Sequence, residues 1–277
     1  MRLRVATCMT LPEPDPDAVP LAEALARANV AFDVVAWDDP KADWTSAHPT
    51  VIRSTWNYAL DVDRYLAWVD RVSKVAPLFN PIEVIRDNLH KRYLLALEAR
   101  GVPIVPTTLV ERGASCDLEA LGHARFVIKP EVGAGSLGAR VFESASSDAA
   151  HHLAGLTAKG AALVQPYIDS VEDYGERSMI YIDGELSHAI RKSPRFAGQS
   201  EMVSGPYPIA DDERAVALAA LAPYGELLYA RVDLARDRGG QPCVMELELV
   251  EPSLFLAKKP GAADRFVAGL LRRLAAH

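Results

Sequence analysis

The chain has 277 residues, 49% of them hydrophobic, and a formal net charge of −7. Its length suits one large domain or two to three small ones, its negative charge argues against nucleic acid as a general partner, and no apolar run is long enough to span a bilayer. Cys8, Cys116 and Cys243 are odd in number and far apart, and the N-terminus lacks a signal-peptide pattern, so we expect a cytoplasmic protein with no membrane partner.

Residues 1–80 alternate between strand and helix patterns. We expect strands at 3–7, 32–37 and 50–53, and helices at 20–29 and 58–75. This alternation predicts a small α/β domain with a parallel sheet.

A helix start follows at Asn80-Pro81-Ile82-Glu83. Asn80 can cap the helix, Pro81 suits its first turn and Glu83 completes a capping box. We expect the helix to run to Arg100 and to stop at Gly101, with Lys91 inside it.

Residues 103–163 are expected to form short strands, with a helix at 149–158. Within them, Gly133, Gly135 and Gly138 spell G-x-G-x-x-G between two strand patterns, 126–128 and 139–142. A dinucleotide-binding turn would lead from a strand into a helix, whereas a loop between strands can fold over phosphates and offer them backbone N–H groups. Lys129, at the end of the first strand, could reach such a phosphate. The alternative is a glycine-rich hairpin with a solvated lysine.

The C-terminal third predicts an antiparallel sheet with helices on one face. Segments 177–182 and 185–190 flank Asp183-Gly184, a hairpin signal. A helix is expected at 211–222, and strands at 228–235 and 243–250.

The last two strands carry acidic residues at alternate positions. Because side chains alternate across a strand, Arg231 and Asp233 share one face, and so do Glu246 and Glu248. If the strands pair, three carboxylates gather and repel one another, which Mg²⁺, a cation that takes oxygen ligands, would offset. The alternative is a solvated sheet face. With the lysines and the glycine loop, the cluster predicts binding of ATP and Mg²⁺ for phosphoryl transfer.

In this order the motifs resemble the ATP-grasp superfamily, which includes D-alanine–D-alanine ligase and glutathione synthetase, over nearly the whole chain. The resemblance implies an α/β and α+β architecture: an N-terminal α/β domain at 1–80 and an ATP-grasp region at 81–277. Within that region it implies a small lid at about 103–163 and an antiparallel core domain at about 164–277. A protein kinase fits less well, because a kinase's glycine loop precedes its lysine strand.

The resemblance also implies roles for residues. The segment 162–168 matches a hinge whose backbone reads adenine, and Glu172 matches a ribose-binding carboxylate. The implied nucleotide contacts are Lys91, Lys129, Gly133, Gly135, Ser136, Gly138, Gln165, Tyr167, Ile168 and Glu172. The implied metal ligands are Asp233, Glu246 and Glu248, and the expected catalytic residues are Arg231, Arg191 and Lys192. The family's usual last pair is Glu-x-Asn, so Glu248 is a departure that adds a negative charge.

The phrases 53–58, 79–81 and 246–254 resemble a narrower group, that of the O-ureido-D-serine cyclo-ligase of D-cycloserine biosynthesis. The group implies a small amino-acid-like substrate. We expect its pocket at 53–58, where Arg53 could pair with a carboxylate, Asn57 could bind an amide or amino group and Trp56 could form a wall. Arg177, like Arg191, could bind a phosphate or a substrate carboxylate, or form a surface ion pair.

The expected activity is ATP-dependent activation of a carboxylate as an acyl phosphate, followed by C–N bond formation. Two alternatives remain: a ligase that joins two separate molecules, and a non-catalytic ATP-binding sensor. A homodimer is left open.

Overall fold

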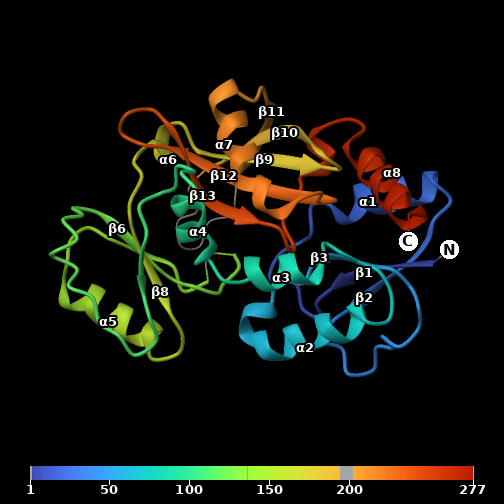
Figure 1. Cartoon of the computed structure of the whole chain (residues 1–277), viewed down its shortest axis with the longest axis horizontal. Helices are drawn as coiled ribbons and strands as arrows, with labels where there is room; N and C mark the ends of the chain where they lie inside the picture. Colours follow the sequence, from blue (N-terminus) through green and yellow to red (C-terminus); the bar gives the residue numbers. More distant parts are fainter. Residues whose placement is uncertain (1, 136, 194–201, 277) are drawn as a thin grey trace.

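The computed structural model describes residues 2–135, 137–193 and 202–276, which form three separate sheets (Figure 1). The first sheet is parallel, with strand order β2-β1-β3-β4. It confirms the predicted parallel sheet and adds the two-residue strand β4, too short to show in the sequence. Its elements are β1 (Arg2–Thr7), α1 (Ala18–Arg27), β2 (Ala31–Ala36), β3 (Thr50–Ser54), the 3₁₀ helix η1 (Tyr58–Leu60), α2 (Val62–Ser73) and β4 (Leu78–Phe79).

The single helix expected between residues 80 and 100 is in fact two. They are α3 (Ile82–Asn88) and α4 (Tyr93–Ala99), and Lys91 lies in the break between them. The capping prediction for Asn80 is also wrong. Its buried side chain instead donates to the carbonyl oxygens of Tyr229 and Leu249, both at 2.8 Å. These hydrogen bonds connect the segment before α3 to the C-terminal antiparallel sheet.

The second sheet has the order β5-β8-β6-β7 and carries the glycine loop between β6 and β7. Figure 1 shows it to one side of the molecule, with α5 packed on it. Because β8 extends to Pro166, the lid that we propose ends nearer residue 166 than 163. Its elements are β5 (Thr108–Val110), β6 (Phe126–Pro130), β7 (Arg140–Phe142), α5 (Ser147–Thr157) and β8 (Ala162–Pro166).

The third sheet is antiparallel, with the order β11-β10-β9-β12-β13. Its elements are α6 (Ser170–Asp173), β9 (Glu176–Ile182), β10 (Glu185–Lys192), β11 (Val203–Tyr207), α7 (Asp211–Leu221), the 3₁₀ helix η2 (Ala222–Tyr224), β12 (Tyr229–Arg236), β13 (Pro242–Glu248), the 3₁₀ helix η3 (Leu256–Lys258) and α8 (Ala262–Ala275).

Helices cover both faces of this sheet, contrary to the expectation of one. On one face Met179, Val232 and Leu234 pack with residues of α4 and α7. On the other face Ile180 and Tyr229 belong to the same apolar cluster as Phe266 of α8. Only one end of the second face is filled in this way, and the polar cluster described below occupies the rest.

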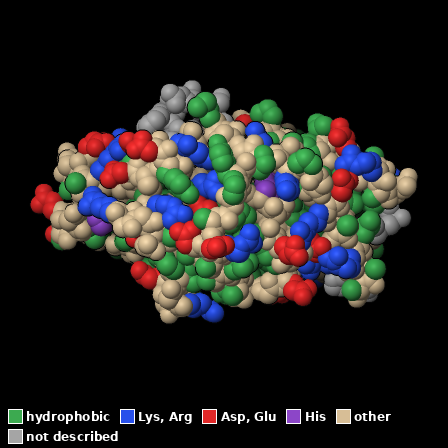
Figure 2. Space-filling view, turned by 90° about the horizontal axis from the view of Figure 1, so that it is seen from above, with side chains coloured by type: hydrophobic (Ala, Val, Ile, Leu, Met, Phe, Trp, Pro, Cys, Tyr) green, Lys and Arg blue, Asp and Glu red, His purple; other side chains and the backbone are tan. Residues whose placement is uncertain are grey.

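Charged side chains of both signs are interspersed over the face shown in Figure 2, without a large area of one sign. Among the described residues, no helix is both long and apolar enough to cross a membrane.

Candidate active site

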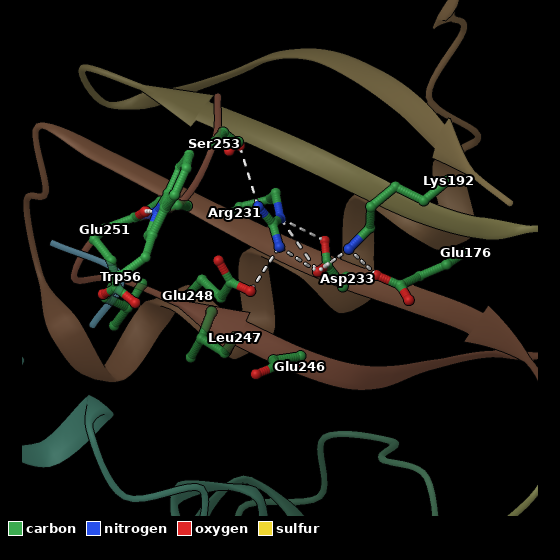
Figure 3. Close-up of polar contacts among 12 residues, drawn as sticks. Trp56, Glu176, Lys192, Arg231, Asp233, Glu246, Leu247, Glu248, Glu251 and Ser253 are labelled. Atoms are coloured by element: carbon green, nitrogen blue, oxygen red, sulfur yellow. Dashed lines mark hydrogen bonds and ion pairs between the residues drawn. The ribbon is translucent and has the colours of Figure 1, made fainter. Parts of the chain in front are cut away.

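The predicted pairing of the last two strands is confirmed. Arg231 lies opposite Glu248, and Asp233 lies opposite Glu246, in the antiparallel register of β12 and β13. Cross-strand partners share a face, so all four side chains project from the same side of the sheet (Figure 3).

Asp233 is the most deeply buried acid of this group, with a side chain 1% exposed. Arg231 contacts it through Nε and Nη2, both at 2.9 Å, and Lys192 of β10 reaches it at 2.8 Å. Burial alone would raise the pKa of the Asp233 carboxyl, but attraction to Arg231 and Lys192 lowers it. Asp233 is therefore ionised at neutral pH.

Lys91 links the glycine loop to the acidic strand. Its Nζ lies 2.7 Å from Glu246 Oε1 and donates to the carbonyl oxygen of Gly133, also at 2.7 Å. The Tyr58 hydroxyl donates to the same carbonyl at 3.4 Å. Burial raises the pKa of Glu246, but Lys91 and then Lys129 outweigh it and lower the pKa to about 2. The loop, the break between α3 and α4, and β13 thus meet at Lys91.

Lys129 differs from the other cations of the cluster. Burial lowers the pKa of its ammonium, and the attraction of Glu246 offsets this only in part. The side chain of Lys129 makes no hydrogen bond or ion pair within residues 2–135, 137–193 and 202–276, whereas Lys91, Lys192 and Arg231 each contact a carboxylate. A lysine near the glycine loop without an anionic contact is suited to receive a phosphate.

The cluster contains two acidic residues that were not predicted from the sequence. Glu176 of β9 pairs with Lys192, and Glu251, just after β13, is 8% exposed. Burial raises the pKa of both Glu176 and Glu251 to about 8, and that of Glu248 to about 7. Five carboxyl groups therefore lie among four cations, Lys91, Lys129, Lys192 and Arg231, and three of the five hold their protons more tightly than usual. A bound cation would favour the ionised form of these three groups.

The raised pKa of Glu248 predicts a pH dependence of stability. The folded protein raises the pKa of Glu248 from 4.5 to about 7, so between these values the native state holds a proton that the unfolded chain releases. The contribution of Glu248 to the unfolding free energy must therefore fall as the pH rises from 4.5 to about 7. Between pH 5 and 8 we expect the unfolding free energy of the wild type to fall more than that of Glu248→Gln, by on the order of 1–2 kcal/mol after solvent screening. Parallel urea-unfolding profiles for the two proteins would contradict this.

The carboxylates fit Mg²⁺ in their chemistry. No group of three His, Cys, Asp or Glu side chains is arranged as a metal cage within the described parts of the chain. However, Glu246 and Glu248 keep side chains 28% and 29% exposed, and carboxylate oxygens are the donors that Mg²⁺ takes. Asp233, enclosed by Arg231 and Lys192, is the least accessible of the three.

Two arginines predicted for this site lie elsewhere. Arg191 and Lys192 are adjacent on β10, so they point to opposite faces, and only Lys192 joins the cluster. Arg191 donates to the carbonyl of Asp173. Arg177 lies opposite Arg191 in the pairing of β9 with β10. It is buried, with Nε 3.1 Å from Glu213 Oε1, and its Nη2 donates to Pro208 O at 2.7 Å. Neither arginine is retained as a catalytic or substrate contact.

Two of the three side chains predicted to bind substrate at residues 53–58 contact other residues of the protein instead. Arg53 is 2% exposed and pairs with the fully buried Asp17 at 3.0 Å, so it does not face a substrate. The side chain of Asn57 accepts a hydrogen bond from Trp37 Nε1 at 2.6 Å and donates one to Asp38 at 2.7 Å, so its polar atoms already have partners. Trp56 Nε1 donates to Glu251 O at 3.0 Å, and it is the member of this set that lies beside the acidic cluster (Figure 3).

The remaining expected nucleotide residues lie on the lid and its exit. Gly135 and Gly138 have φ values of +59° and +76°, the left-handed region that favours glycine, while Ser136 lies outside the described residues. Gln165 donates to Thr107 Oγ1 at 2.8 Å. Arg125 stacks on the Tyr167 ring at 3.7 Å and pairs with Glu172 at 2.6 Å, and Ile168 packs beside Tyr167. Their contact with a nucleotide stays a prediction.

Comparison with known proteins gives three kinds of similarity. A family model described as the N-terminal domain of D-cycloserine synthetase DcsG matches residues 3–80. The cycloserine biosynthesis protein DcsG of Streptomyces lavendulae is 37% identical over 287 aligned residues, which cover 94% of each chain.

The crystal structure of D-cycloserine synthetase DcsG superposes with a TM-score of 0.90 and 35% identity, over 99% of this chain and 100% of that one. D-alanine–D-alanine ligase of Bacillus anthracis, in its complex with ATP, gives a TM-score of 0.72 at 16% identity, over 100% and 98% of the two chains. At that identity the second similarity concerns the fold alone.

Proposed function

The chain belongs to the D-cycloserine synthetase family of ATP-grasp ligases, and on this premise we propose that it closes a ring in O-ureido-D-serine or a closely similar amino acid. The enzyme class, an ATP-dependent ligase that forms C–N bonds, follows from the family. The substrate is carried over from the relatives' names and from the signature phrases at 53–58 and 246–254.

In the proposed reaction, a carboxylate oxygen of the substrate attacks the γ-phosphorus of ATP, giving an acyl phosphate and ADP. A nitrogen of the same molecule then attacks the acyl carbon, loses its proton and expels phosphate. The observation that carries this proposal is the gathering of Lys91, Lys192 and Arg231 on three carboxylates beside the glycine loop. Such a site works mainly by positioning and by stabilising charge.

We assign roles by what each side chain can reach. Lys91, Lys129 and the backbone of the glycine loop bind phosphates, and Arg231 with Lys192 stabilises the acyl phosphate. Glu246 and Glu248 would hold Mg²⁺, with Asp233 joining them if Arg231 or Lys192 turns to phosphate. Mg²⁺, when bound, supplies positive charge against the phosphate oxygens.

The test is ADP release with single amino acids, O-ureido-D-serine included. An intramolecular ligase responds to one amino acid alone, whereas a ligase that joins two molecules requires an added amine. A sensor binds ATP and releases no substrate-dependent ADP. ADP release with O-ureido-D-serine alone supports the proposal, and its absence with every amino acid contradicts it.

Lys129→Ala should weaken ATP binding by about 1.5–3 kcal/mol, because it removes a charge-assisted contact. Calorimetric titration of ATP measures this directly. An unchanged ATP affinity in a folded variant would remove Lys129 from the nucleotide site.

A further inference from the structure

The two signature segments, 53–58 and 246–254, meet in space although they lie about two hundred residues apart. Arg53 Nη2 donates to Pro252 O at 2.7 Å, and Trp56 Nε1 donates to Glu251 O at 3.0 Å. Arg231 Nη1 holds the next carbonyl, that of Ser253, at 3.2 Å. Three side chains therefore fix the backbone of 251–253 and, with it, the position of the Glu251 side chain.

Glu251 is the one acid of the cluster without a cation in contact, within the part of the chain that the structure describes. Glu176, Asp233, Glu246 and Glu248 each contact Lys91, Lys192 or Arg231. Glu251 is more than nine-tenths buried, and its side chain has neither a hydrogen bond nor an ion pair with any described residue. Without a partner, burial raises the pKa of this carboxyl to about 8, so its ionised form requires a nearby cation. The position of Glu251 beside the cluster indicates a cation that arrives with a ligand.

The surroundings of Glu251 place that cation next to the reacting groups. Figure 3 draws Glu251 and Trp56 beside Glu248, at the end of β13. Glu251 also acts electrostatically on the buried Tyr58, whose hydroxyl donates to Gly133 O in the glycine loop. Glu251 is thus close to Glu248 of the carboxylate cluster and acts on a residue that contacts the glycine loop.

We propose that Glu251 binds the α-ammonium group of the substrate amino acid, with Trp56 and Tyr58 as walls of that subsite. This rests on the proposed function, since it takes the substrate to be an amino acid. An ammonium at Glu251 places the neighbouring carboxylate of the same molecule toward Arg231 and the phosphates. The subsite selects amino acids with a free amino group and rejects N-acylated ones, which carry no cation.

The test uses steady-state ADP release with two probes, O-ureido-D-serine and its N-acetyl derivative. With the wild type, the free amino acid should be preferred at least about 100-fold in kcat/KM, because acylation removes the cation that pairs with Glu251. In Glu251→Gln the KM for O-ureido-D-serine should rise about 10- to 100-fold, the KM for ATP should stay within about twofold, and the preference for the free amino group should collapse. Glu251→Asp, which keeps the charge, should recover part of the preference.

Glu226→Gln is the matched control, because Glu226 is highly exposed and lies outside the site. It should behave as the wild type with both probes. If the wild type releases ADP with O-ureido-D-serine but Glu251→Gln keeps its KM and its preference, this inference is overturned and the proposed function stands. The same holds if the wild type accepts the N-acetyl probe equally well, whether or not the variants fold. If no amino acid supports ADP release by the wild type, both are overturned.

Discussion

Glu246→Gln should lose substrate-dependent ADP formation about 10²- to 10³-fold, the usual cost of removing one electrostatic element from a transition state. Glu246 is ionised, with its pKa lowered to about 2, and its side chain is accessible enough to meet Mg²⁺. The amide keeps the shape of the side chain but removes the negative charge that pairs with Lys91 and that would hold Mg²⁺. The comparison of kcat between wild type and variant measures the effect.

The fold should survive this change, because a glutamine oxygen can still accept from Lys91. Unchanged urea unfolding would show that the loss is chemical, and Glu226→Gln should retain the wild-type rate. A partial recovery at high Mg²⁺ concentration would locate the defect in metal binding. Full activity of Glu246→Gln, or wild-type turnover in EDTA, would show that the metal assignment is wrong.

Arg53→Met should lower the unfolding free energy by about 3–5 kcal/mol, the cost of leaving one partner of a buried ion pair alone. Asp17 has a fully buried carboxylate that accepts from Arg53 at 3.0 Å and from the Leu254 and Leu256 amides at 2.5 and 2.7 Å. Without Arg53 its charge stays buried with only these amides. Urea unfolding measures the loss.

The control for Arg53→Met is Arg27→Met. Arg27 also pairs with an aspartate, Asp264 at 2.8 Å, but both side chains are more than half exposed. An exposed pair contributes at most about 1 kcal/mol. The double variant Arg53→Met/Asp17→Asn should recover part of the stability, because it removes the stranded charge. If Arg53→Met unfolds like the wild type and raises only the KM of the amino acid, Arg53 binds substrate after all.

Local periodicity made much of this site predictable. The alternation of side chains put Arg231 with Asp233 and Glu246 with Glu248, and one pairing of strands brought the two sets together. The hairpin at Asp183-Gly184 was equally local, and both residues have positive φ in the structure. The same rule of alternation separates Arg191 from Lys192, so only one of them could have belonged to the site.

Long-range pairing explains what the sequence did not reveal. Arg53 and Arg177 are neutralised by Asp17 and Glu213, each 36 residues away, and no local pattern identifies such partners. Glu176 was missed for a different reason. The register between β9 and β10 shifts by one residue near His188, which places Glu176 opposite Lys192. With an unshifted hairpin, Glu176 would face Arg191 instead.

The proposed mechanism transfers a phosphoryl group to a substrate carboxylate, and oxygen isotopes test this step most directly. The enzyme is given ATP and O-ureido-D-serine labelled with ¹⁸O in its carboxylate, and the released inorganic phosphate is analysed by mass spectrometry. If the carboxylate oxygen attacks the γ-phosphorus, each turnover leaves one labelled oxygen in the phosphate. Phosphate without label, released together with ADP, would mean that water attacks ATP and would contradict the proposed mechanism.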